Sequence, residues 1–297
     1  MKKEIEKTKQ FKLSFFKRLK MSIVNFEEYH FIAADGAKRA IGYFLLIMVF
    51  FSIALSIGLN IKFEQRANEA IEYTKSDLPN FEIVDNKFKI DSENPIILEK
   101  DNYKVIIDND PNYEKYSEDL NNYDGTVLLF NQNNIIAKFD YTSSIAFNYN
   151  SFTNYISEEN TINKESFLNF VTNNRIKINL IIYGYILLEI FLIFTLSTLI
   201  DILALSLIGT ITAKIAGIPL KFGALFSMAV SASTLSIIIN LIYLNLKIFT
   251  NFNIPQFQVL YTLISYIYLV TSIFIMRSNI LKGKLDFETK NNDAEES

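Results

Sequence analysis

The chain has 297 residues, of which 50% are hydrophobic and 21% are charged, with 29 Lys and Arg against 32 Asp and Glu. It contains no cysteine and a single histidine, His30, which excludes disulfides and thiolate chemistry and argues against His-based zinc sites and Ser-His-Asp catalysis. The hydrophobic residues are gathered in long runs, and runs of about 20 apolar residues predict membrane spans. We therefore expect an α-helical polytopic membrane protein that uses no cofactor and no metal.

The N-terminal segment, residues 1–39, holds ten Lys and Arg against five acids. From Phe11 to His30 its aromatic and aliphatic residues alternate with cations, which is typical of an amphipathic helix on an anionic membrane surface. The alternative is a cytoplasmic helix packed on the bundle, and the two are compatible. We expect four cations of this segment to lie at the membrane surface: Lys12, Lys17, Arg18 and Lys20.

The first predicted span is residues 40–62, because Ile41–Ile61 contains no charge and is long enough to cross. Lys38 and Arg39 directly precede it, so the positive-inside rule places the N-terminus in the cytoplasm. We interpret this span as an uncleaved signal anchor, with the next segment outside the cell.

That segment, residues 63–177, has 11 basic and 20 acidic residues, a net charge of −9 that argues against a nucleic-acid partner. Alternating apolar residues predict β-hairpins, flanked by helices that continue from the spans. We expect an extracellular α+β domain with an antiparallel meander sheet on two helical stalks. The expected hairpins are Phe81–Ile90, Ile96–Ile107 and Thr126–Phe139, with a further strand near residues 143–149 and flanking helices Glu64–Ser76 and Lys164–Asn174.

Two features of this segment could carry ligands. Asp108-Asn-Asp110 is similar to the start of a calcium loop, but the glycine and the distal glutamate of that motif are missing. A solvated acidic loop is the favoured interpretation. Several tyrosines could stack on a sugar, although such residues more often pack a small sheet.

Residues 178–217 form an apolar run that would be roughly 60 Å long as one helix, about twice the hydrocarbon thickness of a bilayer. In one interpretation the chain crosses once and continues as a cytoplasmic helical extension. In the other it turns at Asp201 and crosses again. We favour the first, because it keeps Lys214 and Lys221 inside and requires no turn where Gly and Pro are missing.

Two more spans follow, at residues 218–249 and 257–277, joined by a short extracellular turn at residues 250–256. Residues 278–297 form an acidic cytoplasmic tail. The expected architecture therefore has four spans with both termini inside.

Polar residues inside the apolar runs are candidate functional groups, because ionisable side chains in a membrane are expensive. Glu189 lies about halfway through the second predicted span, where it could handle protons or cations. The favoured interpretation is a protonated carboxyl that bonds Asn240 or a serine of the third span and helps the helices to pack. Asp201 is expected near the inner headgroup region. The intramembrane polar candidates are Glu189, Asp201 and Asn240.

Small residues repeat at four-residue intervals and predict close helix packing near the cytoplasmic face. This pattern indicates a bundle and says nothing of a pore. The residues concerned are Gly209, Ala213 and Gly217 in one run and Ser227 and Ser231 in the next.

Several short segments occur in an order that resembles the DUF1189 family of Firmicutes membrane proteins, over about residues 10–285. They are Phe15-Phe16, Asn25–Tyr29, Leu78–Ile83, Val105–Asp108 and Ile218–Phe222. Some members are labelled maltodextrin-utilisation proteins, which implies an accessory role near sugar uptake and transfers no residue. The last three spans are also loosely similar to the Yip1-type membrane domain.

These observations predict a non-enzymatic accessory or sensor protein of a bacterial plasma membrane, whose extracellular domain binds a ligand or partner. The alternative is an oligomeric transport component that uses Glu189. The expected partners are the lipid bilayer and either another protein or further copies of the chain. The sequence does not identify the ligand.

Overall fold

The computed structural model describes residues 13–100, 103–138, 144–156, 161–250 and 252–295. The chain divides into two compact units. The bundle unit comprises residues 1–62 and 182–297, and the insert unit comprises residues 63–181. Each unit has a hydrophobic core of its own residues.

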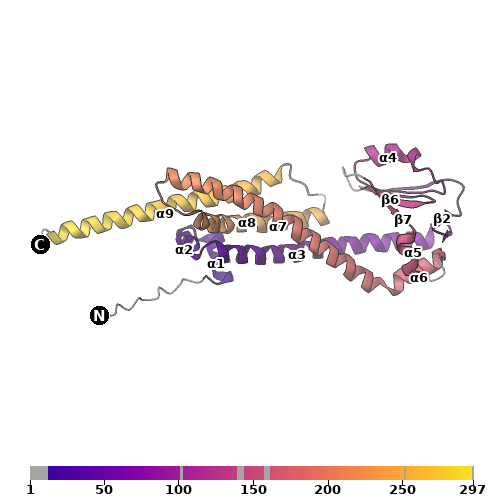
Figure 1. The fold of residues 1–297 in the computed structure, drawn as a ribbon, viewed down its shortest axis with the longest axis horizontal. Coiled ribbons are helices and arrows are strands. Elements are labelled where there is room, and N and C mark those ends of the chain that lie inside the picture. The colour runs from indigo at the N-terminus through magenta and orange to yellow at the C-terminus, as the bar shows by residue number, and fades with distance from the viewer. Residues whose placement is uncertain (1–12, 101–102, 139–143, 157–160, 251, 296–297) are drawn as a thin grey trace. The chain divides into compact units, whose positions relative to one another are not determined.

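The long apolar runs of the sequence form long helices, shown in Figure 1. In the described part of the chain, four helices are long and apolar enough to cross a membrane, as the sequence predicts. They are α3 (Ala37–Ser76), α7 (Arg175–Ile215), α8 (Phe222–Phe249) and α9 (Phe257–Glu295).

Three short elements precede α3: α1 (Phe15–Val24), the 3-10 turn η1 (Phe26–Glu28) and α2 (Tyr29–Asp35). The hydroxyl of Ser14 caps α1 by accepting a hydrogen bond from the Lys17 N–H. Both α1 and α2 pack against α8, and Met21, Tyr29 and Ile32 belong to the core of the bundle unit. This segment is therefore packed on the bundle.

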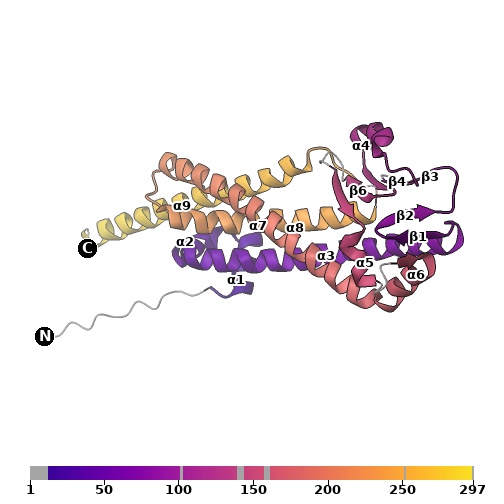
Figure 2. The same ribbon diagram turned by 45° about the vertical axis from the view of Figure 1, so that its right-hand side comes forward.

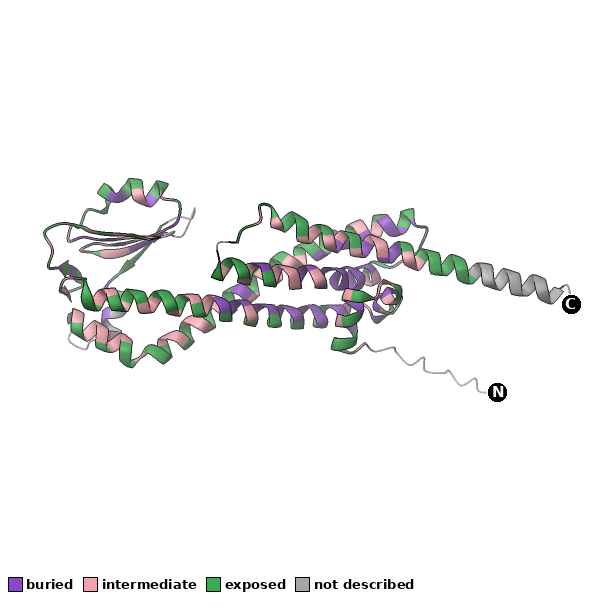
Figure 3. Cartoon of the chain, turned by 180° about the vertical axis from the view of Figure 1, so that it is seen from behind, coloured by how far each residue is buried: buried purple, intermediate pink, exposed green. Residues whose placement is uncertain are grey.

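Burial is uneven among the four long helices, as the colours of Figure 3 show. In the most apolar stretch of each helix, 67% of the residues of α8 are buried but only 11% of those of α7. Helix α8 is therefore the centre of the bundle. Helix α7 leaves most of its apolar surface for lipid or another protein.

Helix α7 continues without a break past Asp201, so the interpretation in which the chain turns there is wrong. The helix ends at Ile215, and Gly217 follows with φ +69°. The N–H groups of Gly217 and Ile218 donate to the carbonyls of Lys214 and Ala213. These two bonds form a Schellman motif, in which glycine adopts the left-handed conformation at least cost.

The insert unit contains two sheets, and Figure 2 labels β1 and β2 of the first and β3, β4 and β6 of the second. The first has the order β2-β1-β8 and the second the order β3-β4-β5-β6-β7. The strands are β1 (Phe81–Val84), β2 (Lys87–Ile90), β3 (Ile96–Lys100), β4 (Tyr103–Ile107), β5 (Thr126–Phe130), β6 (Asn134–Lys138), β7 (Ile145–Asn148) and β8 (Thr161–Asn163).

The three expected hairpins are present as the antiparallel pairs β1–β2, β3–β4 and β5–β6. Between β1 and β2, Asp85 and Asn86 have φ values of 50° and 62°. Two consecutive positive φ angles are what a tight two-residue hairpin turn requires, and Asn and Asp tolerate them.

The expected meander is wrong at one point, because β4 and β5 are parallel. Parallel neighbours need a crossover connection, and the chain between them forms η2 (Tyr113–Tyr116) and α4 (Ser117–Asn122). Tyr116 and Leu120 of these elements pack against one face of the sheet, on Ile106 and Leu129. The alternation of single strands does not reveal this crossover, so the sequence predicted only hairpins.

The second expected stalk is also interrupted. Helix α6 (Lys164–Asn173) begins with a capping box between Asn163 and Ser166. It ends at Asn173, with Asn174 as its C-cap, and α7 begins at Arg175. The Asn174 side chain donates to the Phe170 carbonyl and closes the end of α6. Helix α5 (Asn150–Ile156) completes the unit. By contrast, α3 runs unbroken from the bundle unit into the insert unit.

Candidate functional site in the helical bundle

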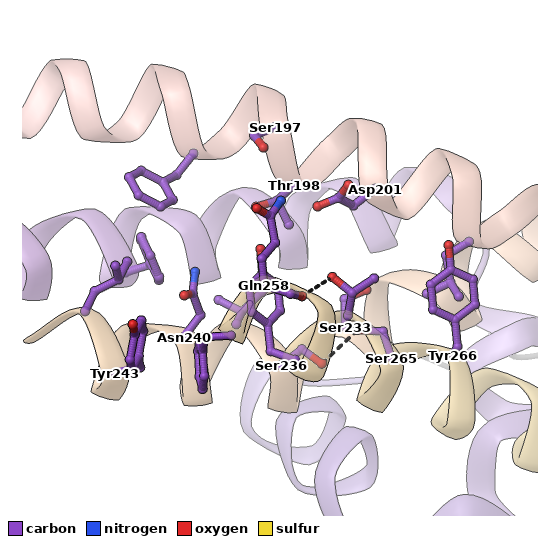
Figure 4. A pocket seen from close by; sticks show the side chains of 18 of the residues that line it. Ser197, Thr198, Asp201, Ser233, Ser236, Asn240, Tyr243, Gln258, Ser265 and Tyr266 are labelled. Carbon is purple, nitrogen blue, oxygen red and sulfur yellow. Dashed lines mark hydrogen bonds between the residues drawn. The ribbon is translucent and has the colours of Figure 1, made fainter. Parts of the chain in front are cut away.

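The bundle unit contains a pocket of about 450 Å³, lined by both polar and apolar residues of α7, α8 and α9, the segment between α8 and α9, and Phe51 of α3. Figure 4 shows the side chains of Ser197, Thr198 and Asp201 on α7 together with those of α8 and α9. We call it the Asp201 pocket. Its polar lining residues are Ser197, Thr198, Asp201, Ser233, Ser236, Asn240, Tyr243, Gln256, Gln258, Tyr261, Thr262, Ser265 and Tyr266.

Much of this lining has unused hydrogen-bonding capacity. The Ser265 hydroxyl donates to Ser236 Oγ at 2.8 Å. In contrast, the side-chain amides of Asn240 and Gln258 bond no other described residue, and neither does the carboxylate of Asp201. The pocket therefore offers a carboxylate and two amides to a guest.

The structure places Asp201 and Glu189 at different positions along the bundle. Asp201 shares the pocket with Ser236, which lies 14 residues after the start of α8 and 13 before its end. It is thus level with the middle of α8 and away from the helix ends. Glu189 lies 12 residues earlier in α7, about 18 Å along the helix axis.

Glu189 is exposed and does not line the pocket. The pairing of Glu189 with Asn240 that the sequence allowed is therefore not formed. Asn240 lies beside the pocket of Asp201. The structure brings Asp201 and Asn240 together and leaves Glu189 apart.

A second polar site lies around Arg18, which is 2% exposed, so its expected place at the membrane surface is wrong. Its Nη1 donates to Asp35 Oδ2 at 3.1 Å and its Nε to Ser231 Oγ at 3.1 Å. Its Nη2 donates to both the carbonyl and the hydroxyl oxygen of Ser227, each at 2.9 Å. The guanidinium carbon lies 4.8 Å from the centre of the Tyr43 ring.

The buried guanidinium of Arg18 thus donates four hydrogen bonds, one of them to a carboxylate. Burial lowers the pKa of Arg18, and the carboxylate of Asp35 opposes that shift. Asp35 also accepts from Arg39 Nη1 at 2.8 Å, while the hydroxyl of Ser227 donates to the Ile32 carbonyl at 2.7 Å. Buried charges are kept only with such partners. We therefore assign the Arg18 site to holding α1 and α2 against α8.

The other expected surface cations differ from Arg18. Lys17 and Lys20 are exposed on α1, and Lys12 lies outside the described residues. The side chain of Arg18 points the other way, because positions three and four apart on a helix share a face and Met21 and Ser22 are buried with it.

The five expected packing residues have different roles. Gly209 lets α7 approach α9, since an added Cβ would lie 2.9 Å from Leu269 Cδ2, and Ala213 is buried. Gly217 forms the turn after α7, and an added Cβ there would meet nothing within 4 Å. Ser227 and Ser231 are buried in α8, where they accept hydrogen bonds from Arg18.

The acidic loop of the insert unit is neutralised internally. Lys115 pairs with both Asp108 and Asp110, and the Tyr116 hydroxyl donates to Asp108 Oδ2 at 2.8 Å. Burial raises the pKa of Asp108, but the bonds from Lys115 and Tyr116 outweigh it and hold the pKa below its ordinary value. Across the described residues, no group of three or more His, Cys, Asp or Glu is placed to hold a metal ion.

Sequence reasoning missed most of the Asp201 pocket. Ser197, Thr198, Ser236, Gln258 and Ser265 are common residues whose convergence depends on how three helices are aligned. The available signal was the number of polar residues within otherwise apolar runs.

The family model DUF1189, described as a protein of unknown function, matches residues 16–273. The chain belongs to the DUF1189 family. The match includes all but the first residue of α1, together with the Arg18 site and the Asp201 pocket of this DUF1189 protein. No curated protein matches the chain, and no solved structure matches it.

Proposed function

We propose that this DUF1189 protein is a non-enzymatic accessory or sensor protein of the bacterial plasma membrane, whose insert unit binds an extended segment of a protein partner. The observation that supports it is strand β7. This strand is at the edge of the five-stranded sheet, and all four of its residues are exposed. Ile145 is 51% exposed and Phe147 is 46% exposed.

An open edge strand attracts another strand, and native proteins commonly protect such edges with lysine, proline or bulges. Strand β7 reads Ile-Ala-Phe-Asn and carries no such protection. Ile145 and Phe147 alternate along the strand and so share one face. A partner strand would gain backbone hydrogen bonds from the edge and apolar contacts from these two side chains.

The charge pattern supports a location outside the cell for the insert unit, because the cations of the N-terminal segment directly precede the first apolar run. The unbroken α3 gives a continuous helical connection from the partner-binding unit to the bundle unit. If the family resemblance to maltodextrin-utilisation proteins extends to this chain, the partner belongs to a sugar-uptake system.

Photocrosslinking in native membranes tests this proposal. Benzoylphenylalanine at Phe147 should give one defined adduct, because a bound partner strand lies against this side chain. The matched control is Tyr113, an aromatic residue that is 45% exposed elsewhere in the insert unit and should give none. Phe147→Lys should remove the partner from the purified protein, whereas Tyr113→Lys should not. Equal adducts at both positions, or none at Phe147, would contradict the proposal.

A second candidate function, an oligomeric transport component, is favoured by the Asp201 pocket. The carboxylate it would use is Asp201, because Glu189 lies outside the pocket. In proteoliposomes with an entrapped pH-sensitive dye, proton-coupled flux should then be abolished by Asp201→Asn and unchanged in Glu189→Gln. Absence of flux in the unaltered protein would argue against transport coupled to protons.

A further inference from the structure

We propose that the Asp201 pocket binds an organic ammonium group, which forms an ion pair with the Asp201 carboxylate inside the bundle. The inference concerns binding alone, so it stands whether the protein senses or transports. It rests on the charge, the lining and the size of the pocket.

The charge of the pocket is unbalanced. Among the lining residues that the structure describes, Asp201 is the only carboxylic acid, and none is Lys, Arg or His. Among the described residues none forms an ion pair with Asp201. Ionisable groups in membrane-spanning helices normally pair with one another or mark a binding pathway. The missing positive charge is therefore one that a guest supplies.

The lining suits an organic cation. Aromatic rings attract a cation placed over their faces. Hydroxyls and amide oxygens accept hydrogen bonds from an ammonium N–H or, for a quaternary ammonium such as choline, from its hydroxyl group. The aromatic lining residues are Phe51, Phe194, Tyr243, Phe257, Tyr261 and Tyr266. In Figure 4, Tyr243, Asn240 and Gln258 lie across the pocket from α7, the helix that carries Asp201.

The size and the charge of the pocket argue against a metal ion and against a neutral sugar as its ligand. The volume of about 450 Å³ lies in the range of small-molecule sites, far above the space that a bare ion needs. Among the described residues, no group of three or more His, Cys, Asp or Glu is placed to hold a metal ion, and the pocket offers a divalent cation a single carboxylate. A neutral sugar could use the hydroxyls and amides, but it would leave the charge of Asp201 uncompensated.

The pocket has two accessible sides. Ile254, Gln256 and Phe257 of its lining lie between the end of α8 and the start of α9, whereas Ser233 and Leu205 lie deeper. Ser197 and Asp201 are exposed on α7. The ammonium group can therefore belong either to a free amine that enters at the helix ends or to a lipid headgroup that enters from the side.

Calorimetric binding to the full-length protein in nanodiscs of phosphatidylglycerol tests the inference, with choline as the cationic probe and 3,3-dimethylbutan-1-ol as its uncharged isostere. Choline should bind at least about tenfold more tightly than the isostere, a difference worth about 1.4 kcal/mol. Maltose, the neutral sugar probe, should not bind the pocket.

Asp201→Asn should weaken choline binding by about tenfold or more, while Asp201→Glu, which keeps the charge, should retain most of it. Glu189→Gln is the matched control, because it removes the other acid of α7 outside the pocket and should leave choline affinity unchanged. Size-exclusion elution and circular dichroism identify any variant that fails to fold. If Asp201→Asn fails to fold, the choline affinity of Asp201→Glu decides the test.

Replacing half of the lipid with phosphatidylethanolamine distinguishes the two sources of the amine. If the headgroup occupies the pocket, the apparent choline affinity falls in the unaltered protein and not in Asp201→Asn. If the guest is a free amine, the affinity is the same in both lipids. Equal affinity for choline and its isostere, or choline binding that survives Asp201→Asn, would overturn the inference.

Discussion

At the scale of single residues, the bundle unit contains two aspartates in opposite environments. The side chain of Asp35 is 2% exposed and lies between two guanidinium groups, those of Arg18 and Arg39. Asp201 has no cationic partner among the described residues. The first carboxylate holds helices together, and the second is available to a guest.

Arg18→Met should destabilise the bundle unit by about 3 kcal/mol, because it removes one partner of a buried pair and leaves two serines of α8 without their donor. Thermal unfolding in detergent micelles measures this. Arg18→Lys should recover only part of the loss, since an ammonium cannot reproduce the planar fork of donors. Lys20→Met, which changes an exposed cation of the same helix, should stay within about 0.5 kcal/mol of the unaltered protein.

Asp201→Asn should instead stabilise the bundle unit and raise the midpoint of thermal unfolding by a few degrees, since it removes an unpaired charge from an apolar stretch. Stability gained at the expense of binding is typical of functional sites. A lower midpoint for Asp201→Asn would show that this carboxylate has a structural partner after all.

At the scale of elements, helices α7 and α9 meet where Gly209 faces Leu269. Without a hydrophobic driving force between helices in lipid, side-chain packing of this kind contributes to holding the helices together. The pocket depends on this contact, because Asp201 and Leu205 reach the lining from the adjacent turns of α7.

Gly209→Val should destabilise the bundle unit by about 1–3 kcal/mol, because the new side chain overlaps Leu269. It should also weaken binding at the Asp201 pocket. The control is Gly184→Val on the same helix, where an added Cβ meets nothing within 4 Å. Thermal unfolding of both variants, side by side, measures the difference, and equal loss in the two would contradict this packing.

In the crossover between β4 and β5, the pairing of Asp108 with Lys115 predicts a dependence on pH. Because the folded-state pKa of Asp108 is lowered, its stabilising effect is complete above the ordinary value of about 3.9 and is lost as the pH falls through the folded-state value. Tyrosine circular dichroism between pH 7 and pH 2.5 should show the unaltered insert unit losing structure below about pH 4. In Asp108→Asn the stability should be lower at pH 7 and should change less over that window.

At the scale of the whole molecule, composition and periodicity predicted the four long helices, the three hairpins and the insertion of a polar segment between apolar runs. These features depend on local pattern. The parallel pairing of β4 with β5, the burial of Arg18 and the convergence on Asp201 depend on contacts between distant segments. A cation on an amphipathic segment gives no local sign of whether it faces lipid headgroups or serines that lie 209 and 213 residues further along the chain.

The separation in sequence between Arg18 and Ser227 determines the order in which parts of the protein assemble during synthesis. At 5–20 residues per second, synthesis of the intervening 209 residues takes about 10–40 s. During that interval Asp35, the carboxylate that pairs with Arg18 and lies 17 positions away, is already present, but the serines of α8 do not yet exist. The N-terminal segment can complete its contacts only after α8 has been synthesised. Its docking is therefore a late step of biogenesis, and a chain that stops short of α8 leaves the guanidinium without most of its acceptors.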